Sequence, residues 1–293
     1  MSYAAAEIES QPGCWRRAAT LAASGQHAAL PRPGERVAIA GCGTSWFIGQ
    51  SYAALREGSG QGETDAFAAS EMPLDRRYDR VLAITRSGTT TEILDLLKRL
   101  PGDIPSVAIT GTADSPVHKL AGDTLLLDWA DEHSVVQTRF ATSTLALLRA
   151  HLGEDLTAAV ADAERALTAP LPLDPATLDQ VTFLGQGWTV GLANEAALKL
   201  REAATFWTEA YPAMDYRHGP ISIAQPGRAV WSFGTPPDGL AEDVAGTGAT
   251  LVTGDLDPMA DLVRAQRLAL ALAAVRGLDA DNPRALTRSV VLD

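Results

Sequence analysis

Hydroxyl side chains gather at one point of the sequence, where a short apolar run ends. The run Val81–Ile84 is followed by "TRSGTTTE", in which five of eight residues carry a hydroxyl group. Capping a helix requires only one such group, whereas a phosphate accepts several hydrogen bonds, each contributing roughly 1.5–3 kcal/mol when charge-assisted. The stretch therefore predicts a phosphate-binding loop. Its candidate contacts are Thr85, Arg86, Ser87, Gly88, Thr89 and Thr90.

A second loop in a similar setting is "GCGTS", residues 41–45, which follows the apolar run "VAIA". Its glycines allow backbone N–H groups to approach a ligand, and the start of the expected helix favours an anion. The loop lacks the third glycine of a dinucleotide-binding fingerprint, and taken alone it is better explained as a tight strand-to-helix turn capped by Ser45. Loops that follow neighbouring parallel strands converge on one crevice, which here suits a small phosphorylated metabolite. The added candidate contacts are Gly43, Thr44 and Ser45.

Titratable side chains recur at helical spacing further along the chain. Glu195, Lys199 and Glu202 stand four and three residues apart, so a helix would place them on one face. His218 follows in "RHGP", a loop by composition. For an arbitrary helix, a solvated and salt-bridged face is the better interpretation. Against it, the surrounding residues are mostly apolar and the helix begins at another Gly-x-Gly turn. No function is assigned to the remaining histidines, which are His27, His118, His133 and His151.

The apolar runs of the sequence alternate with stretches of helical character. These runs and stretches predict the strands and helices that would position the candidate residues. This alternation predicts an α/β fold of parallel strands flanked by helices. The segment "VAIAGCGTS" (37–45) returns as "VTFLGQGWT" (181–189), which indicates duplication of one unit. We expect an N-terminal helical segment at 1–35, a first unit at 36–168, a proline-rich linker at 169–179, a second unit at 180–277 and a tail at 278–293.

Composition narrows the classes of function. The chain has 293 residues and a net charge of −12, and an acidic surface disfavours nucleic acid and anionic membrane as partners. Cys14 and Cys42 form neither a disulfide framework nor a paired metal-binding spacing. The sequence shows no secretory signal and no apolar run of membrane-spanning length. We expect a cytoplasmic protein that uses neither a metal nor another cofactor.

Five segments give the sequence a resemblance to a known family. They are "GCGTS", "TRSGTTTE", "NEAALKLRE", "EAYPAMDYRHGP" and "DNPRALTRSVV". Together they resemble the double sugar-isomerase (SIS) family, in particular the isomerase half of glucosamine-6-phosphate synthase and the stand-alone amino-sugar phosphate deaminases and deglycases. The resemblance runs from about Val37 to the end of the chain. It implies two SIS subdomains, each a flavodoxin-like three-layer α/β/α unit, and a homodimer.

The resemblance also implies roles for individual residues. Glu202, which closes "KLRE", matches the base that moves a proton between C1 and C2, and Lys199 matches a lysine beside that base. His218 matches a ring-opening histidine that reaches the site from the partner subunit. Val135 in "EHSVVQT" would line the sugar, and the tail would close the site. The phosphate would be held by Ser45, Ser87 and Thr90, with Thr85 and Arg86 in the same loop.

Three departures from the synthase pattern shape the expected chemistry. The synthase has an N-terminal glutaminase domain, for which this chain has no room, so we do not expect glutamine-dependent synthesis. Where the synthase tail carries a lysine, "RALTRSV" places Arg288. Arginine stays protonated and is a poor amine nucleophile, although it can bind a phosphate or a sugar oxygen. Thr85-Arg86 stands where the synthase has Ser-Gln, and Arg86 either adds charge to the loop or points to solvent.

We therefore expect an enzyme that acts on an amino-hexose 6-phosphate by proton abstraction at C2. With a free amine at C2, the resulting enediol leads to deamination with isomerisation. With an N-acetyl group, it leads instead to dehydration by loss of the C3 hydroxyl. A protein that only senses a sugar phosphate is the third alternative, but the presence of both Glu202 and His218 favours an enzyme.

Overall fold

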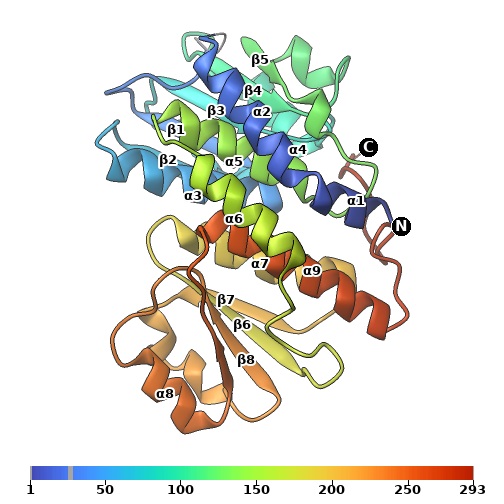
Figure 1. Cartoon of the computed structure of the whole chain (residues 1–293). Coiled ribbons are helices and arrows are strands. Elements are labelled where there is room, and N and C mark those ends of the chain that lie inside the picture. The colour runs from blue at the N-terminus through green and yellow to red at the C-terminus, as the bar shows by residue number, and fades with distance from the viewer. Residues whose placement is uncertain (1, 26–28, 293) are drawn as a thin grey trace. The chain divides into compact units, whose positions relative to one another are not determined.

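The chain folds into two compact units, called unit 1 and unit 2 below (Figure 1). The computed structural model describes residues 2–25 and 29–292. Each unit is assembled from separate stretches of chain, and the five-segment division expected from the sequence stays a prediction. Unit 1 comprises Met1–Pro12, Ser134–Val136 and Thr157–Leu286, and unit 2 comprises Gly13–His133, Gln137–Leu156 and Thr287–Asp293.

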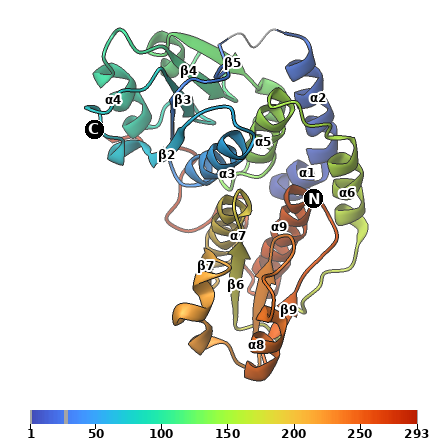
Figure 2. The ribbon, with the colours of Figure 1, turned by 90° about the vertical axis from the view of Figure 1, so that its left-hand side faces the viewer.

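Within its described residues, unit 2 contains five parallel strands in the order β2-β1-β3-β4-β5 (Figure 2). Every residue of β1 and β3 is buried, as expected for a sheet covered on both faces. The strands are β1 (Val37–Gly41), β2 (Thr64–Ala68), β3 (Arg80–Ile84), β4 (Ser106–Thr110) and β5 (Asp123–Leu126). The helices are α2 (Gln11–Ala23), α3 (Thr44–Gly58), α4 (Thr91–Arg99) and α5 (Arg139–His151), with the 3-10 helices η1 (Ala69–Glu71), η2 (Pro116–Lys119) and η3 (Asp128–Ala130).

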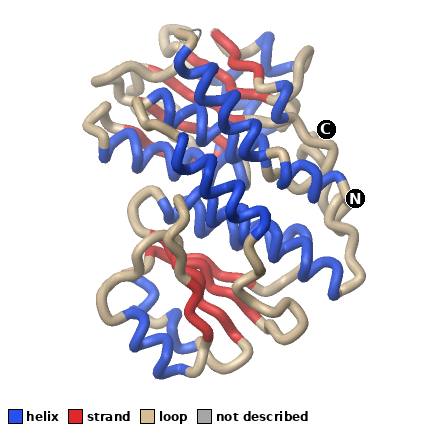
Figure 3. Tube along the Cα trace, in the orientation of Figure 1, coloured by secondary structure: helices blue, strands red, loops and turns tan. Residues whose placement is uncertain are grey.

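In the described part of unit 1, four parallel strands form a second sheet in the order β7-β6-β8-β9. Helices flank the sheets in both units (Figure 3), which confirms the predicted three-layer α/β fold. The strands are β6 (Gln180–Gly185), β7 (Thr208–Pro212), β8 (Arg228–Ser232) and β9 (Thr250–Val252). The helices are α1 (Tyr3–Glu9), α6 (Thr157–Thr168), α7 (Thr189–Ala204), α8 (Leu240–Thr247) and α9 (Pro258–Val275), with the 3-10 helices η4 (Asp215–His218) and η5 (Pro220–Ile223).

The strand order reverses beside the first strand of each sheet. In unit 2, β1 pairs with β2 on one side and with β3 on the other. The chain therefore leaves β1 and β3 in opposite directions, and a crevice opens between these connections at the carboxyl ends of the strands. Both hydroxyl-rich loops of the sequence, after β1 and after β3, lie at this switch point. The equivalent order in unit 1 supports the duplication inferred from the sequence repeat.

A close approach of backbone to backbone brings the end of β1 onto the start of α3. A Cβ atom built on Gly41 would lie 2.5 Å from both the carbonyl carbon of Ser45 and the nitrogen of Trp46. The repeat has the same constraint, because a Cβ on Gly185 would lie 2.3 Å from the carbonyl carbon of Thr189. Only glycine allows this contact without displacing the backbone.

We predict that Gly41→Ala lowers the free energy of unfolding by about 1–3 kcal/mol, because the added methyl group overpacks the turn against backbone atoms. Urea denaturation of the purified variant measures this loss. Gly58→Ala is the matched control, since a Cβ there meets nothing within 4 Å and alanine is favoured in a helix. Equal stability of Gly41→Ala and the wild type would show that the close approach imposes no constraint.

Candidate functional site

The hydroxyl-rich loops of unit 2 line a small cavity at the strand switch point. Its volume is about 30 Å³. Residues expected from the sequence make up most of its wall, so the structure brings them together. They are Ser45, Thr85, Arg86, Ser87, Thr90 and Arg288. The wall also contains residues that the sequence analysis did not select, namely Cys42, Ile84, Ile93 and Gln137.

The hydroxyl groups of the loop after β3 differ in how far the fold uses them. Thr90 occupies the N-cap position of α4, but its side chain makes no capping hydrogen bond. Among the described residues, the Oγ1 atom of Thr85 is buried without a hydrogen-bond partner. Ser87 Oγ accepts hydrogen bonds from the backbone N–H and the hydroxyl of Thr89, at 3.2 and 3.0 Å. The wall therefore retains donors that a ligand could engage.

Other predicted contacts support the loops from outside the cavity wall. Gly88 has φ 64°, and a Cβ there would lie 2.1 Å from Ser115 Oγ, so the turn requires glycine. The hydroxyl of Thr89 pairs with Ser289 Oγ at 2.8 Å. Gly43 has φ 52° and forms the N-cap of α3, and Thr44 is buried. These residues shape the loops, and the structure does not place them in the wall.

Two guanidinium groups reach the cavity, and each faces a carboxylate. The side chain of Arg86 is 1% exposed, and its Nη1 lies 3.6 Å from Glu132 Oε2. Arg86 therefore points into the protein and not to solvent. Arg288 contacts the Asp131 carboxylate and the carbonyl oxygen of Glu132.

The end of the tail lies against the loop after β3. The carbonyl oxygen of Arg288 accepts a hydrogen bond from Arg86 Nη2 at 3.0 Å. The carbonyl oxygen of Val290 accepts one from Thr91 N at 3.1 Å, and Leu292 N donates to Thr91 Oγ1 at 2.8 Å. The tail thus accepts a hydrogen bond from one of the N–H groups at the start of α4, which have no partner within the helix.

Cys42 lies in the cavity wall but is a poor nucleophile. Burial, together with the nearby Glu92 carboxylate, raises the pKa of its thiol to about 11. The thiol therefore stays protonated at neutral pH. Gln137 has its Oε1 atom buried in the described structure without a hydrogen-bond partner, so this amide is a further candidate contact for a ligand.

In unit 1, one lysine on α7 bridges two carboxylates. Lys199 Nζ lies 2.5 Å from Glu202 Oε2 and 3.4 Å from Glu195 Oε1. The side chains of Lys199 and Glu195 are 1% and 0% exposed, whereas that of Glu202 is 20% exposed. The spacing predicted from the sequence is therefore realised on one helix face, and that face is not a solvated one. The family resemblance assigns no role to Glu195, yet its carboxylate belongs to this cluster.

The other candidates in unit 1 occupy short connecting segments. His218 ends η4 and is exposed. Val135 is half-buried, and its N–H donates to the carbonyl oxygen of Asp281 at 3.1 Å. Its neighbour Ser134 hydrogen-bonds the buried Glu7 carboxylate of α1. The N-terminal helix thus fixes the segment that carries Val135.

Two of the histidines without an assigned function, His118 and His151, hydrogen-bond other parts of the protein. His118 uses both ring nitrogens within the protein, on Thr124 Oγ1 at 3.1 Å and on the carbonyl oxygen of Thr112 at 3.0 Å. His151 contacts the carbonyl oxygen of Pro31. His27 lies outside the described residues.

The Gly-x-Gly turn of unit 1 has the same form as that of unit 2. It differs in that its hydroxyl group, on Thr189, is hydrogen-bonded within the protein. Gly187 has φ 57° and Thr189 is buried. The hydroxyl of Thr189 lies 2.8 Å from Gln186 N, 3.0 Å from Gln186 O and 3.3 Å from Phe233 O. Because this hydroxyl already makes hydrogen bonds within the protein, the turn in unit 1 is a poorer candidate for binding phosphate.

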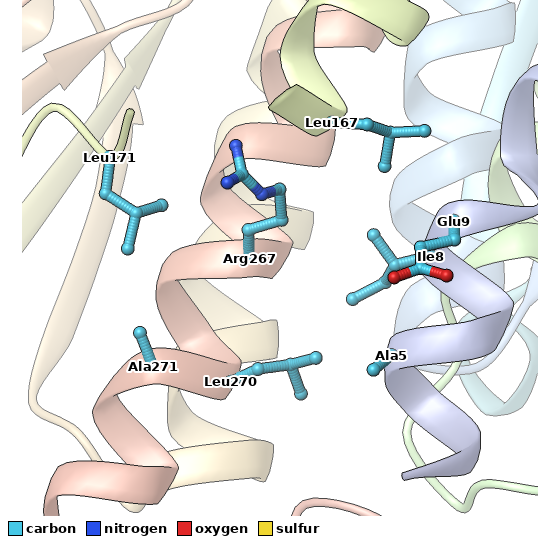
Figure 4. A pocket seen from close by; sticks show the side chains of 8 residues that line it. All are labelled: Ala5, Ile8, Glu9, Leu167, Leu171, Arg267, Leu270 and Ala271. Atoms are coloured by element: carbon cyan, nitrogen blue, oxygen red, sulfur yellow. The ribbon is translucent and has the colours of Figure 1, made fainter. Parts of the chain in front are cut away.

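Unit 1 also contains a larger, mainly apolar groove of about 310 Å³ between α1 and α9 (Figure 4). Side chains of Ile8, Leu167 and Leu270 line it, with Glu9 and Arg267 at its sides. Arg267 Nη1 donates to two backbone carbonyl groups. No cluster of hydroxyl groups lines this groove, so it does not suit a phosphate.

Over residues 2–25 and 29–292, no cluster of histidine, cysteine, aspartate and glutamate side chains is arranged to hold a metal ion. No helix in the same residues combines the length and the hydrophobicity needed to cross a membrane.

Comparison with known proteins places these features in context. No protein-family model matches the chain. The chain is 26% identical to the glutamine–fructose-6-phosphate aminotransferase (isomerizing) of Xylella fastidiosa strain Temecula1, over 88% of this chain and 52% of that protein. The chain spans about half the length of the curated relatives it matches.

Solved structures share the fold over nearly the whole chain. A glucosamine-6-phosphate deaminase from Thermotoga maritima matches with a TM-score of 0.83 and 24% identity, over 99% of this chain and 100% of that chain. The C-terminal domain of a glucosamine-fructose-6-phosphate aminotransferase from Francisella tularensis matches with a TM-score of 0.83 and 21% identity, over 97% and 98%. The resemblance predicted from the sequence is thereby confirmed: the chain is similar to the isomerase half of these aminotransferases and has the fold of the SIS phosphosugar isomerases.

Proposed function

We propose that the protein is an enzyme that deaminates and isomerises an amino-hexose 6-phosphate of the glucosamine 6-phosphate type. The observation that carries this proposal is the unit 2 cavity, where hydroxyl and guanidinium groups converge at the switch point of a parallel sheet. The substrate class is taken from the sequence similarity to glutamine–fructose-6-phosphate aminotransferases and from the structural likeness to a glucosamine-6-phosphate deaminase.

The cavity of unit 2 would bind the phosphate group. Ser45, Ser87 and Thr90 would donate hydrogen bonds to its oxygens, and the start of α4 would add partial positive charge. The buried hydroxyl of Thr85 supports this assignment, because a buried polar atom without a partner costs free energy that a ligand would recover.

Glu202 would act as the general base, a role that rests on the family resemblance. It would take the C2 proton of the open-chain aldose, whose C1 carbonyl acidifies that proton, and deliver it to C1. With an amine at C2 the product of this transfer is a ketimine, which water hydrolyses to ammonia and fructose 6-phosphate. The Lys199 ammonium contacts Glu202 and is itself shared with Glu195, so it would hold the base in place.

Dehydration of an N-acetylated amino-sugar 6-phosphate is the second candidate. The same base would remove the C2 proton, and the C3 hydroxyl would leave as water. Arg288 favours keeping this alternative, because it occupies the position of the synthase lysine yet contacts Asp131 and offers no amine nucleophile. A sensor without chemistry is the remaining possibility, and the turnover assay below distinguishes it.

We predict that Glu202→Gln lowers turnover by about 10²–10⁴-fold, as expected for loss of a positioned general base. The purified protein is incubated separately with glucosamine 6-phosphate and N-acetylglucosamine 6-phosphate, and products are followed by mass spectrometry with an ammonia assay. Ammonia with fructose 6-phosphate supports deamination, and loss of one water from the acetylated sugar supports dehydration. Binding of either sugar without turnover by the wild type would favour the sensor.

The control for this assay is Glu242→Gln, which removes a carboxylate from the exposed surface of α8 in the same unit. Its turnover should equal that of the wild type. Unchanged turnover in Glu202→Gln would remove Glu202 from the mechanism while leaving the phosphate site untouched.

We also propose a homodimer in which His218 opens the sugar ring in the site of the partner subunit. If so, mixing inactive Glu202→Gln and His218→Asn subunits restores activity, because each mixed dimer holds one site with both groups intact. Random exchange of subunits in a two-fold dimer would recover about a quarter of wild-type activity. No recovery after complete exchange, checked by native mass spectrometry, would mean that His218 acts within its own subunit or not at all.

A further inference from the structure

We propose that Glu132 sets the charge of the unit 2 cavity. As the buried counter-ion of Arg86, it keeps the affinity for phosphate low, so that neutral donors and not a net positive charge bind the ligand. This inference deepens the proposed function and rests on it, because it concerns the same phosphate subsite.

The charge that Glu132 balances is buried and permanent. The Arg86 side chain is 1% exposed, and a guanidinium group does not lose its proton in a protein. Nη2 donates to the Arg288 carbonyl oxygen at 3.0 Å, and Nη1 lies 3.6 Å from Glu132 Oε2. A buried charge is costly unless it is paired, and the fully buried carboxylate of Glu132 provides the partner.

Helix α5 fixes the orientation of Glu132. Its Oε1 atom accepts hydrogen bonds from Thr138 N at 2.6 Å, Thr138 Oγ1 at 2.8 Å and Arg139 N at 2.8 Å. These donors lie at the start of α5, where a carboxylate is favoured. Oε1 therefore accepts the hydrogen bonds from the start of α5, and Oε2 faces Arg86. The carboxylate cannot rotate away from Arg86 without leaving the helix start unsatisfied.

The second cation of the cavity is balanced in the same way. Arg288 contacts the carboxylate of Asp131, the residue next to Glu132. This pair is more accessible, with side chains 36% and 30% exposed. Glu92 adds a further carboxylate in the first turn of α4. A phosphate dianion would thus meet the repulsion of these carboxylates together with the attraction of the guanidinium groups.

The expected effects form a cycle of variants that each remove one charge. Glu132→Gln keeps an acceptor for α5 but removes the negative charge, so inorganic phosphate should bind roughly tenfold more tightly. Arg86→Gln leaves the carboxylate unbalanced, so phosphate should bind roughly tenfold more weakly. The double variant restores the balance and should return the affinity close to that of the wild type. Isothermal titration calorimetry with inorganic phosphate and with glucose 6-phosphate, at low and high salt, measures each affinity.

Tighter binding of phosphate by Glu132→Gln would show that Glu132 acts through its charge. If Glu132 only supported the loop, its loss would damage the loop and lower the affinity for phosphate. Thermal unfolding of each variant is recorded alongside. Asp131→Asn is a second variant, in which the carboxylate beside Arg288 loses its negative charge. It should also tighten phosphate binding. Glu154→Gln is the matched control, since it removes a glutamate that pairs with Arg149 near the other end of α5, and it should leave the affinity unchanged.

Tighter binding in Glu132→Gln and Asp131→Asn that weakens at high salt supports the proposal. Equal or weaker binding in folded Glu132→Gln overturns it, whatever Asp131→Asn does, while the proposed function stands. A wild type that binds neither inorganic phosphate nor glucose 6-phosphate contradicts the proposed function itself, and this proposal falls with it.

Discussion

The reversal of strand order beside β1 is the constraint on which the unit 2 cavity depends. Because the chain leaves β1 and β3 in opposite directions, the carboxyl ends of these strands are open to a ligand. Gly41 then allows the start of α3 to touch the strand end, which brings Ser45 to the same edge as Ser87 and Thr90. The hydroxyl groups converge because the topology leaves this edge free, and the glycines let the backbone turn sharply enough to use it.

The repeated unit shows how one framework can carry different chemistry. Unit 1 has the same strand order and the same constrained glycine, yet Thr189 is satisfied by the protein itself. Its helix α7 instead buries a lysine between two carboxylates, with Glu202 as the more accessible one. A buried cation faces carboxylates in both units: Lys199 contacts Glu195 and Glu202 in unit 1, and Arg86 is paired with Glu132 in unit 2.

Much of this arrangement could be predicted from local sequence. The apolar runs gave β1, β3 and β6, and the excess of hydroxyl groups marked the loop after β3 because capping alone does not explain it. The pairing of Arg86 with Glu132 could not be predicted, since it joins the loop after β3 to the segment before α5 and depends on tertiary packing. Gln137 gave no signal for the same reason. Composition also cannot show which hydroxyl groups support their neighbours, as Thr89 does through Ser87 and Ser289.

Exchange of the C2 hydrogen of glucosamine 6-phosphate and of N-acetylglucosamine 6-phosphate, each incubated in deuterium oxide, tests the central claim most directly. Proton abstraction at C2 is common to deamination and dehydration, so this measurement does not depend on which product forms. Proton NMR of the sugar with the wild-type protein should show loss of the C2 hydrogen signal, or deuterium at C1 of the ketose product. A sugar phosphate that binds but keeps its C2 hydrogen, with no deuterium in any product, would contradict the account.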